Sequence, residues 1–208
     1  MKKIAVTQRL VENLGYYELR EMLDIRWAKL LGSIDLLPII LPYEANFLEY
    51  FNSIDIEGVL LTGGNDLSSV NDDKVSHLRD NFEVRLLSFA IDNNIPVYGV
   101  CRGMQLINNY FSGEVVEIND HVGITHSLLV NKDSKYFDEL NMLDKVNSFH
   151  NYAVSIVGDN LLVSAATSDG VIKAIEHLDY KIFAQMWHSE RNDPFNSQEL
   201  KFIQDFFK

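Results

Sequence analysis

Short apolar runs alternate with amphipathic stretches of helical spacing throughout the first half of the chain, and this alternation leaves few folds open. Each run is as long as a buried strand, and each intervening stretch is long enough for a crossover helix. Strands are predicted over residues 4–7, 36–41, 59–62 and 95–100, and helices over residues 16–31 and 79–93. This order predicts an α/β fold, with a mostly parallel central sheet and helices on both faces.

The second half of the chain has a different pattern, in which short β-like runs follow one another closely. The runs cover residues 115–118, 124–130, 161–166, 171–176 and 181–187. Turn residues such as those at 168–170 separate them, which predicts antiparallel strands in the C-terminal half. Asn196 followed by Glu199 predicts the start of a last helix. Because there are only four prolines and no polar linker, we expect one domain over residues 1–208.

Charge and cysteine content exclude several classes of protein. The chain carries 18 basic and 30 acidic side chains, a net charge of −12, which argues against a nucleic-acid partner. One cysteine cannot form an internal disulfide or a cysteine-rich zinc site. No apolar stretch reaches the ~20 residues that span a bilayer, and the start does not resemble a secretory signal. We therefore expect a cytoplasmic protein with no membrane partner.

Cys101 stands between a predicted buried strand and a predicted helix, with Gly99 and Gly103 two residues to either side. This is the cysteine counterpart of the nucleophile elbow, in which a tight turn lifts the nucleophile above the end of the sheet. The helix N-terminus favours the thiolate, and Gln105 lies on the same helix face, within reach of the same pocket. The alternative is a structural cysteine that packs as a small hydrophobe. The paired glycines favour the nucleophile.

A cysteine nucleophile needs a base, and the base needs an orienting group. His188 and Glu190 are two residues apart at the end of an apolar strand, so in an extended segment both side chains point the same way. The alternative is an exposed histidine beside an unrelated glutamate. The spacing of the other histidines does not match that of metal ligands, so we predict that there is no metal site. These histidines are His77, His121, His126 and His177.

Gly63 and Gly64 follow the third predicted strand, at the sheet edge where parallel α/β folds build their sites. A Gly-Gly turn there can direct backbone N–H groups inward, as donors to an oxyanion. It can equally be a tight surface turn. A phosphate-binding loop is a poorer interpretation, because the Lys-Ser/Thr of a P-loop is missing.

Together these segments resemble the class I glutamine amidotransferase superfamily, and more narrowly its free-standing γ-glutamyl hydrolase branch, which includes γ-glutamyl-γ-aminobutyrate hydrolases. The likeness covers nearly the whole chain. It rests on Gly-Val-Cys-Arg-Gly-Met-Gln at 99–105 and Trp-His-Ser-Glu at 187–190. It is supported by Leu-Thr-Gly-Gly-Asn-Asp at 61–66, Arg-Asp-Asn-Phe-Glu at 79–83 and the segment at 146–154.

The resemblance implies a flavodoxin-like fold with Cys101 as nucleophile, His188 as base and Glu190 as the partner of the base. It implies oxyanion donors in the backbone of the Gly63-Gly64 turn and of Arg102. The residues that it assigns to the amino-acid end of a γ-glutamyl group are Gln105, His150, Asn151 and Tyr152. Met186 and Ser189 depart from the glutamine and proline that are usual in the branch, which puts loop rigidity and local substrate contacts in question.

The function that we predict is hydrolysis of a small-molecule γ-glutamyl amide through a γ-glutamyl thioester, with no metal or organic cofactor. One rival is a glutaminase subunit that supplies ammonia to a synthase partner, and another is a catalytically silent binding module. The resemblance extends to branch members whose leaving group is a nucleotide phosphoramidate such as CDP-amidate, used in capsule modification. Arg9 and Arg191 would then contact the leaving group, or else be ordinary surface charges. The oligomeric state stays open, with a homodimer as one option.

Overall fold

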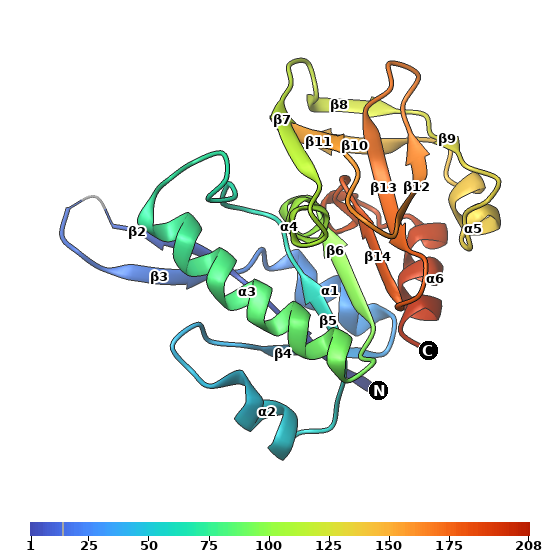
Figure 1. Ribbon diagram of the computed structural model, residues 1–208. Coiled ribbons are helices and arrows are strands. Elements are labelled where there is room, and N and C mark those ends of the chain that lie inside the picture. Colours follow the sequence, from blue (N-terminus) through green and yellow to red (C-terminus); the bar gives the residue numbers. More distant parts are fainter. Residues whose placement is uncertain (14) are drawn as a thin grey trace.

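A computed structural model describes residues 1–13 and 15–208 of the chain. Its centre is an eight-stranded sheet in the order β4-β1-β5-β6-β14-β13-β12-β9 (Figure 1). The parallel strands are β1 (Lys2–Val6), β4 (Leu36–Ile40), β5 (Ile56–Leu61), β6 (Val97–Val100) and β14 (Ile182–Gln185). Numbered along the chain, these five strands run 2-1-3-4-5, which is the flavodoxin-like order. The predicted α/β fold is confirmed.

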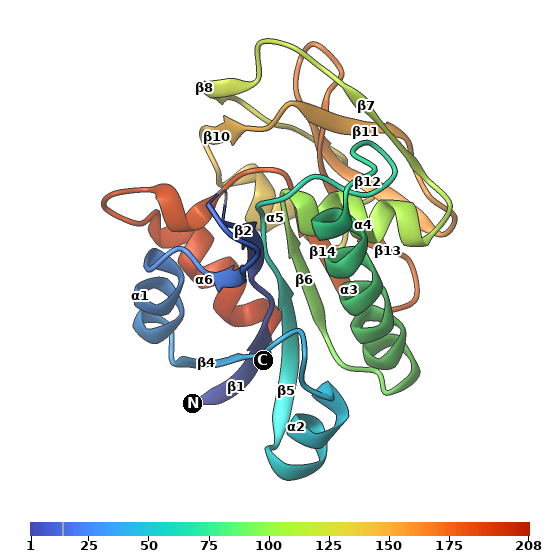
Figure 2. The ribbon, with the colours of Figure 1, turned by 90° about the vertical axis from the view of Figure 1, so that its left-hand side faces the viewer.

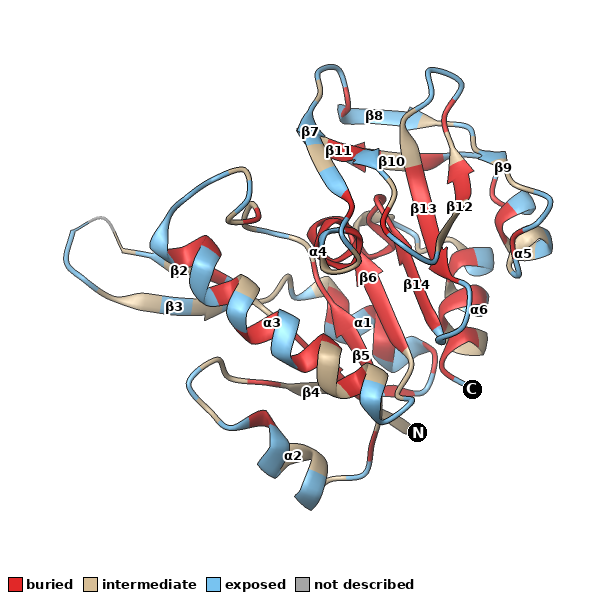
Figure 3. Cartoon of the chain, in the orientation of Figure 1, coloured by how far each residue is buried: buried red, intermediate tan, exposed pale blue. Residues whose placement is uncertain are grey.

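Helices cover both faces of this sheet, as predicted. Helices α1 (Arg26–Ser33) and α6 (Ser197–Phe206) lie on one face, and α3 (Lys74–Asp92) and α4 (Arg102–Tyr110) lie on the other (Figure 2). The short helices α2 (Phe47–Ser53) and α5 (Phe137–Asn141) lie at the periphery. Buried residues line the sheet and the inward faces of the helices (Figure 3), so the core holds the strand ends in place.

The C-terminal half contains the predicted antiparallel strands. Strands β13 (Ile172–His177), β12 (Leu161–Ala166) and β9 (Leu129–Val130) extend the central sheet in antiparallel fashion. Two further pairs form a layer beside the carboxyl ends of the parallel strands (Figure 1). They are β7 (Glu114–Glu117) with β11 (Tyr152–Ile156), and β8 (Val122–His126) with β10 (Val146–Phe149).

The helix predicted over residues 16–31 is wrong in its first half. Leu19–Met22 is strand β3, which pairs with β2 (Arg9–Glu12) in an antiparallel hairpin. The helix starts only at Arg26, whose backbone N–H donates to the Asp24 carboxylate at 3.0 Å. Leu19 and Met22 are three residues apart and fit a helix face, but in the strand they point to opposite faces, and Met22 is 50% exposed.

Two other helix starts are set by side-chain caps. Helix α3 begins at Lys74, five residues before the predicted start, because Asp73 accepts the Ser76 N–H at 2.6 Å. Helix α6 begins as predicted, with the Asn196 side chain accepting the Gln198 N–H at 2.8 Å. Within the described ranges, none of the helices has both the length and the apolar character needed to cross a membrane.

Candidate active site

Cys101 lies at a sharp turn between β6 and α4, at the carboxyl edge of the parallel strands. Its backbone has φ 54° and ψ −103°, a strained conformation for a residue other than glycine. A side chain at Gly103 would clash with the backbone carbonyl of Leu61, and one at Gly99 would lie 2.7 Å from Ile107 Cδ1. Both glycines are therefore needed for α4 to sit directly on β5 and β6. The local geometry is that of the predicted elbow.

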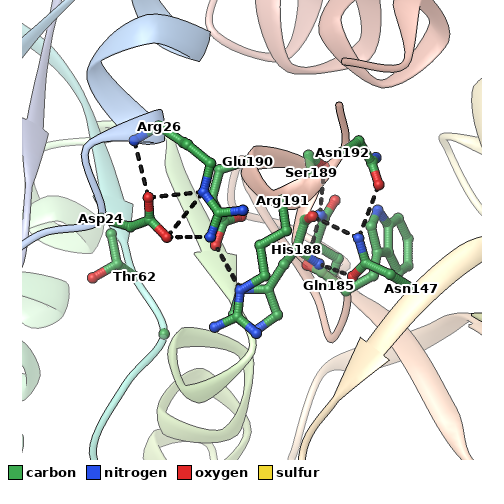
Figure 4. Close-up of polar contacts among 12 residues, drawn as sticks. Asp24, Arg26, Thr62, Asn147, Gln185, His188, Ser189, Glu190, Arg191 and Asn192 are labelled. Atoms are coloured by element: carbon green, nitrogen blue, oxygen red, sulfur yellow. Dashed lines mark hydrogen bonds and ion pairs between the residues drawn. The ribbon is translucent and has the colours of Figure 1, made fainter. Parts of the chain in front are cut away.

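His188 and Glu190 are brought together at the end of β14. Nδ1 of His188 lies 2.6 Å from Oε1 of Glu190, and both side chains are only 3% exposed (Figure 4). The predicted extended segment is wrong, because residues Ser189–Arg191 form a single 3-10 turn. This turn brings the Glu190 carboxylate back to the His188 ring.

The charge state of His188 follows from its neighbours. Burial lowers the pKa of His188, but its electrostatic interactions with Cys101 and with the Glu190 carboxylate outweigh burial and raise that pKa to about 9. At neutral pH the His188 ring is therefore favoured as an imidazolium. In the described part of the chain, Nε2 of His188 is buried and has no hydrogen-bond partner. That nitrogen is available to a group bound beside Cys101.

Asn147 fixes the backbone of His188, a role that the sequence did not reveal. Its side-chain oxygen accepts the His188 N–H at 2.8 Å, and its nitrogen donates to the His188 carbonyl at 2.8 Å (Figure 4). Its only sequence signal is its place within the segment 146–154. The Ser189 hydroxyl accepts a hydrogen bond from Gln185 at 2.9 Å, and Met186 is fully buried, so both departures are tied into the structure.

The Gly63-Gly64 turn lies against Cys101 and His188. A Cβ on Gly63 would be 2.9 Å from His188 Cε1 and 3.5 Å from Cys101 Cβ, so only glycine leaves the ring its space. Neither of the two glycine N–H groups donates a hydrogen bond to another described residue. The Arg102 side chain is buried and bonded to Glu83 and Asp80, so of this residue only the backbone is a candidate for contact with a bound substrate. The oxyanion role of these groups stays a prediction.

Gln105, His150 and Tyr152 meet at one carbonyl. The Tyr152 carbonyl oxygen accepts from Gln105 Nε2 at 3.0 Å and lies 2.8 Å from His150 Nδ1. Because a carbonyl can only accept, Nδ1 carries the proton, and Nε2 of His150 accepts from the Lys173 ammonium at 2.7 Å. Burial and Lys173 lower the pKa of His150 to about 3, so this ring is neutral. Asn151 is exposed. Their contacts with a substrate remain predicted.

Lys173 on β13 carries a fully buried ammonium group, which was not predicted from the sequence. Besides His150, its Nζ contacts His121 Nδ1 at 3.1 Å, and burial lowers the pKa of Lys173 to about 8. His126 stacks on His121 with ring centroids 4.5 Å apart, so His121, His126 and His150 form a cluster. An ammonium holds the centre of the cluster. Among the described residues, no group of three or more metal-binding side chains is present.

A cavity of about 240 Å³ opens beside His188 and Glu190, on the side of the β2–β3 hairpin. Arg9 and Arg191, the two predicted leaving-group contacts, both line it. The Arg191 guanidinium lies 4.7 Å from the centroid of the Phe149 ring, and its Nε is 3.8 Å from Glu190 Oε1. The remaining wall includes Met22, Leu23, Asp24 and Trp27, which the incorrect helix prediction could not place.

A nucleophile elbow and a His–Glu pair at the carboxyl edge of a 2-1-3-4-5 sheet define the class I glutamine amidotransferase-like proteins. Within that class, the chain belongs to the Peptidase C26 family, whose model matches residues 4–190. It is therefore a hydrolase that acts on an amide bond.

Individual proteins agree with this placement. The chain is 35% identical over 201 residues to a gamma-glutamyl-CDP-amidate hydrolase of Campylobacter jejuni, covering 95% of this chain and 94% of the relative. It is 30% identical over 198 residues to Protein NtpR of Enterococcus hirae, covering 83% and 82%. Its fold is similar to the crystal structure of a glutamine amidotransferase from Thermotoga maritima, with a TM-score of 0.68 and 13% identity, covering 98% of this chain and 83% of that one.

Proposed function

We propose that the protein hydrolyses a γ-glutamyl amide through a γ-glutamyl thioester on Cys101. The observation that carries the proposal is the strained turn at Cys101, which lies with His188 around Gly63, while Nδ1 of His188 is 2.6 Å from Glu190 Oε1. This is the arrangement of a nucleophile, a base and an orienting group. The free Nε2 of His188 supports the same assignment, because a base needs one nitrogen without a fixed partner.

In the proposed reaction, the Cys101 thiolate attacks the γ-carbonyl carbon and a C–S bond forms. The carbonyl oxygen becomes an oxyanion that accepts hydrogen bonds from backbone N–H groups of the Gly63-Gly64 turn and of Arg102. Nε2 of His188 donates its proton to the amide nitrogen as the C–N bond breaks, and the amine leaves. His188 then takes a proton from water, which attacks the thioester and releases glutamate and the free thiolate.

The leaving amine that we propose is an anionic nucleotide phosphoramidate, such as CDP-amidate, formed in the cytoplasm for capsule modification. Two observations support it. The cavity beside His188 is lined by Arg9 and Arg191, which supply local cations in a protein of net charge −12. The Campylobacter jejuni relative, similar over nearly its whole length, bears the name of an enzyme for this substrate.

The reaction class is tested by comparing substrates on the purified full chain. We expect release of amine from γ-glutamyl amides, little release of ammonia from glutamine, and loss of both in Cys101→Ala. Faster ammonia release from glutamine than amine release from every γ-glutamyl amide would favour the glutaminase rival. Turnover that persists in Cys101→Ala would exclude a cysteine mechanism.

The leaving-group class is tested with Arg9→Ala and Arg191→Ala, with the exposed Arg85→Ala as the matched control. A charge-assisted hydrogen bond of ~1.5–3 kcal/mol corresponds to a rise in KM of about 10- to 150-fold for γ-glutamyl-CDP-amidate. KM for a neutral γ-glutamyl amide should stay within about twofold. Equal effects on both substrates, or no effect on either, would remove the case for a phosphate-bearing leaving group.

A further inference from the structure

A cluster of buried charges lies directly beneath the two backbone segments that face Cys101. Arg79 and Glu83, one turn apart on α3, are both fully buried, and Arg102 is 1% exposed. Arg79 Nε donates to Oε1 of Glu83 at 3.0 Å, while Arg102 Nη1 donates to the other oxygen of the same carboxylate. The second terminal nitrogen of Arg102 binds Asp80. One carboxylate therefore joins two guanidinium groups.

The terminal nitrogens of Arg79 donate hydrogen bonds to the turn after β5. Its Nη2 donates to the Thr62 carbonyl at 2.8 Å, and its Nη1 donates to the Gly63 carbonyl at 3.0 Å. In a trans peptide the C=O and the following N–H point in opposite directions. When both carbonyls turn toward Arg79, the N–H groups of Gly63 and Gly64 turn away from it. Gly63 itself lies against Cys101 and His188, so those donors are held on the side of the site.

The other guanidinium belongs to the residue that follows the nucleophile. The fork of Arg102 is fixed on Glu83 and Asp80, and this fixes the first turn of α4, which carries the Arg102 N–H. Burial raises the pKa of Glu83, but Arg102 and Arg79 outweigh burial and the net pKa is lowered, so the carboxylate is charged. Its two oxygens thus connect the first turn of α4 to the turn after β5.

We infer that Arg79, Glu83 and Arg102 form a clamp that sets the spacing between the two sets of backbone donors in the proposed oxyanion site. The effect of this clamp on catalysis rests on the proposed function, whereas its effect on the position of the backbone does not. The three are positioning residues, since none of their side chains touches the reacting atoms. A purely structural cluster would stabilise the fold without favouring the transition state over the bound substrate.

The test uses the full chain with Arg79→Lys, which keeps the charge but cannot hold two carbonyls and a carboxylate at once. Arg85→Lys on the exposed side of the same helix is the matched control. We expect kcat for a γ-glutamyl amide to fall by about 10- to 100-fold with KM nearly unchanged, less than the ~10²–10³-fold loss of a whole oxyanion donor. The rate of Cys101 alkylation by iodoacetamide, which needs a thiolate but no oxyanion, should stay within about twofold.

Hydrogen exchange of the unliganded protein tests the clamp independently of any substrate. The amides of residues 62–64 should exchange at least several-fold faster in Arg79→Lys than in the wild type or in Arg85→Lys. Unchanged exchange overturns the clamp, and faster exchange with unchanged kcat overturns its catalytic role. Parallel losses of kcat and alkylation also overturn it, because the defect would then lie in the nucleophile.

If Arg79→Lys does not fold, Glu83→Gln replaces it in every measurement, since it keeps the shape of the side chain and removes the shared charge. A wild-type chain that hydrolyses no γ-glutamyl amide would defeat the proposed function and, with it, the catalytic role inferred for the clamp. The exchange rates would still decide whether the clamp holds the turn.

Discussion

Replacing Glu190 with glutamine should lower the pKa of His188 while leaving the ring in place. The carboxylate oxygen is 2.6 Å from Nδ1, and both side chains are 3% exposed, so solvent and salt screen the pair weakly. Loss of an opposite charge at this range shifts a pKa by about 1–3 units. At 1.36 kcal/mol per unit, the imidazolium loses ~1.4–4 kcal/mol, and its pKa falls from about 9 to roughly 6–8.

The titration of the His188 ring is measured by NMR, and its signals are assigned by their absence in His188→Asn. The alkaline limb of the pH profile of kcat/KM reports loss of the His188 proton that is donated to the leaving amine. This limb should move to lower pH by the same amount. The raised pKa also stabilises the fold below pH ~6.5, a contribution that is lost as the pH rises through about 9 and that shrinks in Glu190→Gln. An exposed carboxylate changed in the same way, Glu49→Gln, is the control. A His188 pKa that stays near 9 in Glu190→Gln would refute this reasoning.

Three further predictions follow from single contacts. Burial raises the pKa of Glu199 to about 7, so its contribution to wild-type stability should be lost as the pH rises from ~4.5 to 7. In urea unfolding, the free energy of unfolding of Glu199→Gln should gain up to about 3 kcal/mol on that of the wild type as the pH rises over that range. A difference between the two proteins that does not change with pH would contradict this. Gly103→Ala should cost about 1–3 kcal/mol of stability and most of the activity, because its Cβ meets the carbonyl of Leu61; a variant that melts and turns over like wild type would show that the elbow tolerates a side chain. Asn147→Ala should lower kcat more than KM, since it frees the backbone of His188, and an unchanged kcat would deny Asn147 that role.

The parallel strands and the elbow could be predicted from the sequence because their signals are local. A strand buried on both faces is a continuous apolar run, and the elbow is a cysteine between glycines at fixed spacing. The β2–β3 hairpin could not be predicted in this way, because Leu19 and Met22 have the spacing of a helix face although they lie on opposite faces of the strand.

Contacts between distant segments left no pattern to read. Lys173 is held by His121, Ser148 and His150, which are 23 to 52 residues away along the chain. A lysine within an apolar strand looks like an outward-facing residue until those partners are known. Arg79 is a similar case, since the sequence predicted its helix but not its hydrogen bond to the turn at Gly63.

The most direct measurement of the proposed mechanism is the mass of the intact protein, quenched in acid during turnover of a γ-glutamyl amide. A thioester mechanism requires an adduct with the mass of one glutamyl acyl group, located on Cys101 by peptide mapping and absent from Cys101→Ala. The adduct should decay as substrate is exhausted. Steady turnover with no adduct at any quench time, together with activity in Cys101→Ala, would contradict covalent catalysis by Cys101.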